Sequence, residues 1–280
     1  MQSAPTSPAI IPPSDSDFRD YPIPAAIARP DEVSYRHYPV NQSLPESRDP
    51  LVDALASGLA GRSFYARTDG LNAPYHRALD GSLPNIWLRR TLVEKLHRVN
   101  DRVRPYGLEV FLLDGYRTIA CQMDIYNYFI EIARAVLPDP TPEACREYVK
   151  DYIGWPGDFD PANPLTWISH KTGAAVDLTL REIASGEHVY MGGIFDDPSS
   201  VSTTCFFEQS NGPAGASANE ARRNRRLLFW AMWHEEFANL PEEWWHFDYG
   251  DQLWAKNRRF VDPALPIVTA WYGPVSLPDE

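Results

Sequence analysis

The segment Ser169–Leu180 reads "SHKTGAAVDLTL", and its character changes at Gly173. The first half is polar and typical of a loop, whereas "GAAVDLTL" alternates in the manner of a β-strand with one apolar face. This alternation directs Asp177 to the opposite face, toward a polar region. His170 and Asp177 are both metal ligands, but two ligands do not make a site, so the rest of the chain must supply a third.

Helical and strand patterns interleave before this segment. Apolar residues recur at helical spacing within Trp87–Val103, which predicts a helix there, and Gly107 ends it. The apolar run Leu108–Leu113 predicts a short strand. A second helix is expected over Ile119–Val136, and Pro138 stops it. A third is expected from Pro142 onward, since the preceding threonine is a suitable N-cap.

Two more patterns follow the segment. Residues 219–240 predict a long helix whose arginine-rich start forms a solvated or ion-paired face. The aromatic run "EEWWHFDYGD" at Glu242–Asp251 is strand-like and comes directly after Pro241. Because helices and strands alternate without a regular βαβ period, the chain is expected to form a mixed α+β domain.

The N-terminal fifth of the chain has a different composition. Residues 1–50 are rich in proline, serine and aspartate, which predicts a proline-rich arm that is either extended and partly ordered or wrapped irregularly around the core. Residues 51–280 are then expected to form one catalytic domain, although 280 residues also suffice for two small domains.

Charge and cysteine content limit the partners and the location. The formal net charge of −12 argues against nucleic acid as a partner, because a phosphate-binding surface needs a positive excess. No window approaches the length of about 18 apolar residues that a membrane span needs. The three scattered cysteines favour a reducing compartment. A cytoplasmic protein is expected, and a periplasmic one stays open if a signal peptide has been removed.

A second histidine with a nearby carboxylate completes a possible metal site. His246 follows Glu243 by three residues, and His170 precedes Asp177 by seven. Two imidazoles and one carboxylate make a three-ligand zinc site with an open position, and a remaining carboxylate can accept a proton from water. The alternative is that Asp177 caps a turn and His246 packs among tryptophans. The other histidines are isolated, as structural or surface residues commonly are: His37, His76, His97, His188 and His234.

The spacing of Glu243 and His246 raises a geometric question. In a regular strand these two side chains point to opposite faces. Either Glu243 lies on irregular backbone before the strand, which Pro241 permits, or the two residues are not a functional unit.

Five segments in order resemble the zinc-dependent D,D-peptidases of peptidase family M15, specifically the D-alanyl-D-alanine dipeptidases related to the vancomycin-resistance dipeptidase. Together they span Leu108–Asp248, about half of the chain. The segments are "DGYR" at Asp114–Arg117, "SHKTGAAVDLTL" at Ser169–Leu180, "MGGIFD" at Met191–Asp196, "NEARRNRRLL" at Asn219–Leu228 and "EWWHF" at Glu243–Phe247.

The resemblance implies a fold and a metal. It implies a single zinc D,D-peptidase domain, similar to hedgehog and D,D-peptidase domains, with a small antiparallel sheet flanked by helices. His170, Asp177 and His246 are then expected to hold one Zn²⁺ per chain. Glu243 is expected to act as the general base and later as the proton donor to the leaving amine.

The resemblance also implies roles in substrate binding. Arg117 is expected to stabilise the oxyanion of the tetrahedral intermediate, and Asp196 to bind the free ammonium of the substrate. Tyr65 is the candidate that shares this ammonium site, with Tyr75 as the second choice. Ser169 is expected among the substrate-binding residues.

The chain departs from the family pattern in places. Thr118 stands where the family has a proline after "DGYR", and Ile168 where a serine is expected two places before the first zinc histidine. The stretch around 125–165 looks like an addition.

The expected activity is hydrolysis of D-alanyl-D-alanine or a related small dipeptide, which is the expected partner. Two alternatives remain, namely a D,D- or L,D-carboxypeptidase that acts on longer peptidoglycan peptides and a zinc-stabilised binding module without activity. Another divalent metal can use the same ligands, and the sequence does not set the oligomeric state.

Overall fold

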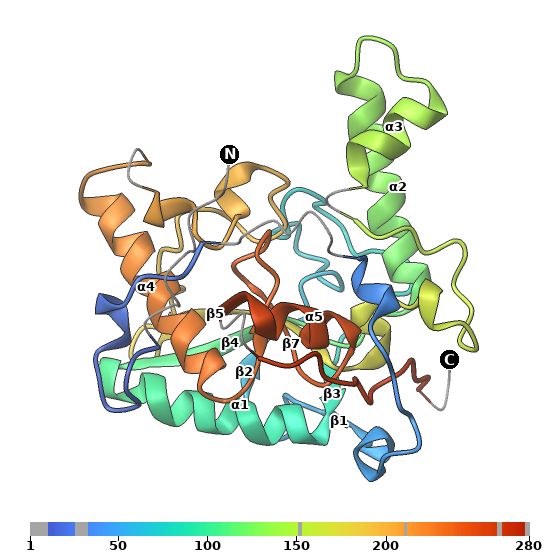
Figure 1. Ribbon diagram of the computed structural model, residues 1–280. Coiled ribbons are helices and arrows are strands. Elements are labelled where there is room, and N and C mark those ends of the chain that lie inside the picture. The colour runs from blue at the N-terminus through green and yellow to red at the C-terminus, as the bar shows by residue number, and fades with distance from the viewer. Residues whose placement is uncertain (1–10, 26–32, 151–152, 210–211, 262–264, 278–280) are drawn as a thin grey trace, which may run out of the picture.

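The structure is a computed structural model that describes residues 11–25, 33–150, 153–209, 212–261 and 265–277. A five-stranded sheet lies at its centre, with strands in the order β2-β4-β5-β7-β6 (Figure 1). A separate two-stranded sheet pairs β1 with β3. The strands are β1 (Leu51–Asp53), β2 (Ala60–Gly61), β3 (Trp87–Arg89), β4 (Leu108–Asp114), β5 (Ala175–Glu182), β6 (Ala238–Asn239) and β7 (His246–Asp248).

Most of the central sheet is antiparallel, as predicted. The β4–β5, β5–β7 and β6–β7 pairs are antiparallel, whereas β2 and β4 are parallel. A parallel pair needs a long crossover between its strands, and here the crossover contains β3 and α1. The α+β class is confirmed, with this one parallel pair as a correction to an all-antiparallel sheet.

Five α-helices occur in the described part of the chain. They are α1 (Arg90–Val103), α2 (Ile119–Val136), α3 (Pro142–Val149), α4 (Ala216–Trp233) and α5 (Gln252–Val261). The 3-10 helices are Phe18–Asp20, Tyr35–His37, Pro45–Arg48, Arg104–Tyr106, Pro164–Thr166, Ser169–Thr172, Ser200–Ser202 and Phe206–Glu208. In Figure 1, α1 runs along one side of the sheet, and α3 with the adjoining part of α2 stands out from the rest of the molecule.

Local signals predicted the ends of two helices correctly. The hydroxyl of Thr118 accepts a hydrogen bond from the backbone N–H of Cys121 at 3.0 Å and caps α2. Thr141 caps α3 in the same way, with Pro142 in its first turn. The helix predicted within Trp87–Val103 begins only at Arg90, because the three residues before it pair with β1.

The described parts of the N-terminal arm pack against the domain. Phe18 is buried and stacks on His234, with ring centroids 4.9 Å apart. Further along, the backbone N–H of Asn41 donates to the carbonyl of Ala270 at 2.8 Å. These contacts correspond to irregular structure wrapped around the core, while the division at residue 50 stays a prediction. Residues 1–10 and 26–32 of the arm lie outside the described residues.

The ion pairing predicted for the arginine-rich start of α4 is seen at Arg226, but the helix predicted over residues 219–240 ends at Trp233, because Ala238–Asn239 pair with β7 as β6. Arg226 binds Glu208 through two N–O contacts of 2.6 and 2.7 Å. Arg225 is buried and donates to the carbonyls of Met191, Val201 and Thr203. It thereby ties α4 to the loop over residues 191–203. Over the described residues, none of the helices combines the length and the apolar character that crossing a bilayer requires.

Candidate metal and substrate site

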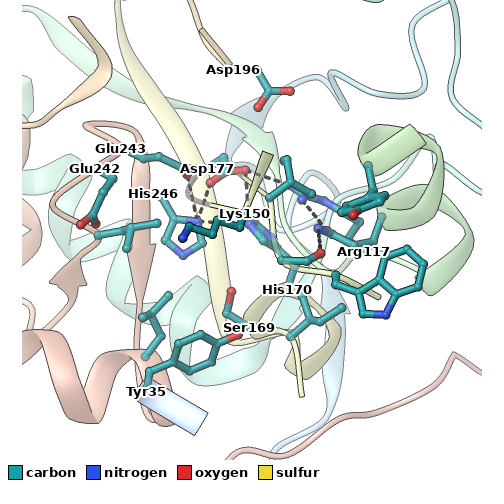
Figure 2. Close-up of a pocket in the computed structure, with 18 of the residues that line it drawn as sticks. Tyr35, Arg117, Lys150, Ser169, His170, Asp177, Asp196, Glu242, Glu243 and His246 are labelled. Atoms are coloured by element: carbon teal, nitrogen blue, oxygen red, sulfur yellow. Dashed lines mark hydrogen bonds and ion pairs between the residues drawn. The ribbon is translucent and has the colours of Figure 1, made fainter. Parts of the chain in front are cut away.

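Three residues from different elements converge at the centre of the sheet. His170 lies in the 3-10 helix before β5, Asp177 within β5, and His246 at the start of β7, where it is the register partner of Asp177. Their ligand atoms all lie within 4.8 Å of one another. The group can therefore hold a metal ion, and it is shown in Figure 2.

Gly173 lets the chain turn from the 3-10 helix into β5. Its backbone has a φ of +68°, a conformation that favours glycine. An added Cβ would also lie 2.3 Å from Cδ2 of Leu51. The glycine therefore suits this turn, which lies between the two ligands His170 and Asp177.

Hydrogen bonds orient both imidazole rings toward this point. Nδ1 of His170 donates to the carbonyl of Gly115 at 2.7 Å, which leaves its Nε2 unprotonated and facing the centre of the group. Nε2 of His246 lies 3.1 Å from both carboxylate oxygens of Asp248, so that its Nδ1 faces the same centre. These two inward nitrogens are 3.2 Å apart. Two ring nitrogens this close need a cation between them, either a proton on one ring or a metal ion, so the donor set fits a metal.

The electrostatics of the group agree with this fit. Burial and the nearby Arg117 guanidinium hold the pKa of His170 well below its usual value, so the ring is neutral. Burial opposes ionisation of Asp177, but the His170 and His246 imidazoles outweigh it and lower the pKa of Asp177. The site thus presents a neutral His170 imidazole and an ionised Asp177 carboxylate, as metal binding requires. Burial opposes protonation of His246, but Asp248 and Asp177 outweigh it and raise the pKa of this ring, so a metal ion must displace a proton from it.

Glu243 lies beside the metal group on a turn rather than in a strand. The backbone N–H of His246 donates to the carbonyl of Glu243, and β7 begins only at His246. Strand alternation therefore does not apply, and Oε2 of Glu243 lies 3.7 Å from Nδ1 of His246. The side chain is 24% exposed. Burial in the cavity wall, together with the Asp177 and Asp196 carboxylates, raises the pKa of Glu243 to about 8.

Arg117 is a buried cation fixed by several acceptors. Its Nε donates to Asp114 at 2.9 Å, Nη1 to Gln122 at 2.8 Å and Nη2 to Asp177 at 3.2 Å. Nη2 also donates to the hydroxyl of Tyr65 at 3.3 Å. The guanidinium is thus held next to the metal group in one orientation.

Asp196 lies across the cavity from this cluster. The hydroxyl of Tyr65 donates to its Oδ2 at 3.1 Å, and the hydroxyl of Tyr75 binds the same oxygen. Both tyrosines suggested by the sequence therefore contact this carboxylate. Burial raises the pKa of Asp196 above its usual value. In Figure 2, Asp196 lies on the opposite side of the metal group from Ser169.

One cavity of about 1040 Å³ joins the metal-binding group to Arg117, Asp196 and Glu243. All eight site residues suggested by the sequence line it: Tyr65, Arg117, Ser169, His170, Asp177, Asp196, Glu243 and His246. The volume is at the upper end of the range of about 300–1,000 Å³ that is common for small-ligand sites. The cavity therefore has room for a dipeptide and for further groups.

Sequence reasoning missed two carboxylates that support the cluster. Asp114 pairs with Arg117, and Asp248 pairs with His246. Asp248 had a detectable signal, since residues two apart on a strand share a face. Asp114 stood within the "DGYR" motif but was assigned no role.

The contact between Asp248 and His246 leads to a testable expectation. A carboxylate that accepts the outer N–H of a ligand histidine fixes the ring and increases its basicity, and its loss typically costs about 10- to 100-fold in metal affinity. Asp248→Asn keeps the side-chain shape and is expected to weaken zinc binding by about 10-fold, at the low end of that range. Competition with a chromogenic chelator measures this, with the thermal midpoint of the apo protein as the control for folding. Unchanged affinity would show that Asp248 does not orient His246.

The family model and the curated relatives indicate the same family. The sequence model of the D-Ala-D-Ala dipeptidases (Peptidase_M15) matches residues 51–265. A D-alanyl-D-alanine dipeptidase of Synechocystis sp. is 37% identical over 177 residues, or 60% of this chain and 69% of the relative. One of Streptomyces coelicolor is 30% identical over 199 residues, or 70% and 88%. Among solved structures, VanYB in complex with D-alanine-D-alanine has a TM-score of 0.40 at 16% identity and covers 70% of this chain and 89% of that chain.

The family match covers most of the chain and includes every residue of the cluster described above. The chain is a peptidase and belongs to the D-Ala-D-Ala dipeptidase family.

Proposed function

We propose that this protein is a zinc-dependent dipeptidase that hydrolyses D-alanyl-D-alanine or a closely related small dipeptide. The observation that supports this proposal is that four chemical groups line the same cavity. These are a metal-binding group, a carboxylate with a raised pKa, a fixed cation and a second carboxylate at a distance. A peptide bond with a free amine on one side needs this combination.

His170, Asp177 and His246 are the residues that would hold the zinc ion. Two histidines and one carboxylate are the ligands of many catalytic zinc sites, which keep a position open. When bound there, zinc supplies Lewis acidity and lowers the pKa of water.

Glu243 is proposed to move the proton. Its carboxylate accepts a proton from the attacking water while the new C–O bond forms at the peptide carbonyl. As the C–N bond breaks, the same side chain gives this proton to the departing amino group. A pKa raised toward neutrality suits a group that must both take up and release a proton.

Arg117 is proposed to stabilise the negative charge that develops on the carbonyl oxygen. The side chain is only 7% exposed and is already oriented by Asp114 and Gln122. A charge fixed in a water-poor site does not have to reorganise during the reaction, which is why such groups lower activation barriers.

Asp196 is proposed to bind the free ammonium group of the substrate. Asp196→Asn removes the charge but retains the shape, and it is expected to raise KM for D-Ala-D-Ala by about 10-fold or more, the usual effect of losing a charged hydrogen bond. Steady-state kinetics on D-Ala-D-Ala measure this. Asp101→Asn is the control, because this exposed carboxylate does not line the main cavity or the smaller one beside it. Equal KM values for Asp196→Asn and the wild type would contradict the ammonium role.

The function is tested with zinc-loaded protein and a panel of peptides. We expect hydrolysis of D-Ala-D-Ala, much weaker hydrolysis of L-Ala-L-Ala and little cleavage of an N-acetylated tripeptide that ends in D-Ala-D-Ala.

A smaller cavity of about 220 Å³ shares Asp196 and Glu243 with the main one. This space favours a second candidate function, carboxypeptidase activity on longer peptides. Preferential cleavage of the acetylated tripeptide would support that second function and contradict the first.

A further inference from the structure

The cavity carries opposite charges at its two ends. Asp196 lies on one side of the metal group, and Tyr35 and Ser169 lie on the other (Figure 2). If the proposed dipeptidase function holds, a dipeptide with its ammonium at Asp196 and its peptide bond at the metal group must direct its C-terminal carboxylate toward the Tyr35 side. A positively charged side chain is therefore expected on the Tyr35 side to bind this carboxylate.

Four cations besides Arg117 line the cavity, and they fall into two pairs. Arg146 of α3 and Lys150, which follows this helix directly, form ion pairs with Glu143 and Glu147 of α3. The other two are Arg36 and Lys256. Among the described residues, no carboxylate lies within ion-pair distance of Arg36 or Lys256. These two charges are available for an anion.

Arg36 is held at the Tyr35 end by neutral partners. Its Nε donates to the carbonyl of Trp167 at 3.1 Å, which is also the acceptor for the hydroxyl of Tyr35. A Cβ on Gly154 would lie 3.6 Å from Nη2 of Arg36. The carbonyl of Gly154 in turn accepts a hydrogen bond from Gln122 at 3.3 Å, and Gln122 also binds Arg117. The guanidinium thus lies near the residues that position Arg117, and among the described residues no carboxylate pairs with it.

Lys256 comes to the same end from α5. The side-chain amide of Gln252 donates to the carbonyl of Arg36 at 2.8 Å and so joins the arm to the first turn of α5. Lys256 follows Gln252 by four residues, and residues at this spacing share one face of a helix. Ile168, which also lines the cavity, has no polar side-chain group for an anion.

We propose that Arg36 and Lys256 bind the C-terminal carboxylate of the substrate, so that the N-terminal arm completes the active site. Arg36 lies before residue 51, where the match to the family begins. A planar guanidinium with a nearby ammonium is well suited to a carboxylate. Together with Asp196, these residues set the direction of the dipeptide and restrict the substrate to one with a free C-terminus.

The test compares D-Ala-D-Ala with its C-terminal amide. The wild-type protein is expected to favour the free acid in kcat/KM by about 10- to 100-fold, the usual effect of one or two charged hydrogen bonds. Arg36→Ala is expected to raise KM for the acid by about 10-fold with little change in kcat, and to leave the amide unaffected. Arg36→Lys should recover part of the loss, and Lys256→Ala should act in the same direction as Arg36→Ala. Arg48→Ala is the matched control, because Arg48 is an exposed cation of the same arm outside the cavity.

If Arg36 had only a structural role, Arg36→Ala would lower kcat or stability for D-Ala-D-Ala and its C-terminal amide alike. Comparing the KM values of the two substrates therefore distinguishes a structural role from carboxylate binding. Calorimetric binding of both ligands to Glu243→Gln, with and without Arg36→Ala, gives the same comparison without turnover. If the wild type cleaves D-Ala-D-Ala but treats acid and amide equally, or if Arg36→Ala keeps the wild-type preference, the carboxylate site is refuted and the dipeptidase function stands. If the wild type cleaves neither, the proposed function fails and this proposal falls with it.

Discussion

Replacing His170 by alanine is expected to remove the metal and abolish hydrolysis. The ring supplies one of three converging ligands, and its Nε2 has no role other than to face His246 and Asp177. Loss of an outer partner of a metal ligand typically costs about 10- to 100-fold in affinity, so loss of a ligand itself should exceed about 100-fold. Metal content of the purified variant by mass spectrometry and kcat/KM on D-Ala-D-Ala measure the two effects.

A control variant shows whether the effect comes from loss of the metal site or from removal of any histidine. His188 is exposed, lies outside the cavity and contacts the ring of Phe111. His188→Ala is expected to retain its metal and its activity. Removing the metal from the wild-type protein with a chelator should abolish hydrolysis, as His170→Ala does. Added zinc should then restore hydrolysis by the wild-type protein but not by His170→Ala. A His170→Ala variant that binds one equivalent of zinc with wild-type affinity would refute the ligand set.

Replacing Glu243 by glutamine is expected to stop turnover while the metal stays bound. The amide cannot take a proton from water, and loss of a general acid–base typically lowers kcat by about 10²–10⁴-fold. Glu243 is not a member of the metal-binding group, so zinc affinity should remain near that of the wild type. Single-turnover kinetics with D-Ala-D-Ala, together with metal analysis of the same preparation, measure both quantities.

The adjacent residue provides the control for Glu243. Glu242 also lines the cavity and is exposed. Glu242→Gln removes the same charge one residue away and is expected to keep most of the activity. If both variants lose activity equally, the effect is due to the electrostatic field of the cavity rather than to proton transfer by Glu243. Full activity of Glu243→Gln would exclude its proposed role.

Structural features that depend on neighbouring residues in the sequence were predicted correctly. The alternation in β5 correctly directed Asp177 away from the apolar face, because side chains of a strand alternate whatever the strand pairs with. The ends of α2 were predicted as observed, since a cap acts through bonds within one turn. Thr118, a departure from the family pattern, turns out to be that cap.

Features that depend on distant pairing were not predicted. Trp87–Arg89 was assigned to a helix, yet it pairs with Leu51–Asp53. The parallel β2–β4 pair also went unpredicted, because a two-residue strand has no periodicity to detect. The sequence also did not decide whether the side chains of Glu243 and His246 lie on the same side of the chain, which the turn before β7 determines.

The amino-acid sequence by itself determined the α+β class and the residues of a possible metal-binding group, because each depends on residue identity and on patterns within short segments. Only the tertiary structure showed that Asp248 contacts the outer nitrogen of His246, that Tyr65 and Tyr75 both bind Asp196, and that Arg36 of the arm lines the cavity. Those contacts join residues far apart in the chain or depend on where a turn ends. Their distances follow from sheet register and packing, which no local pattern encodes.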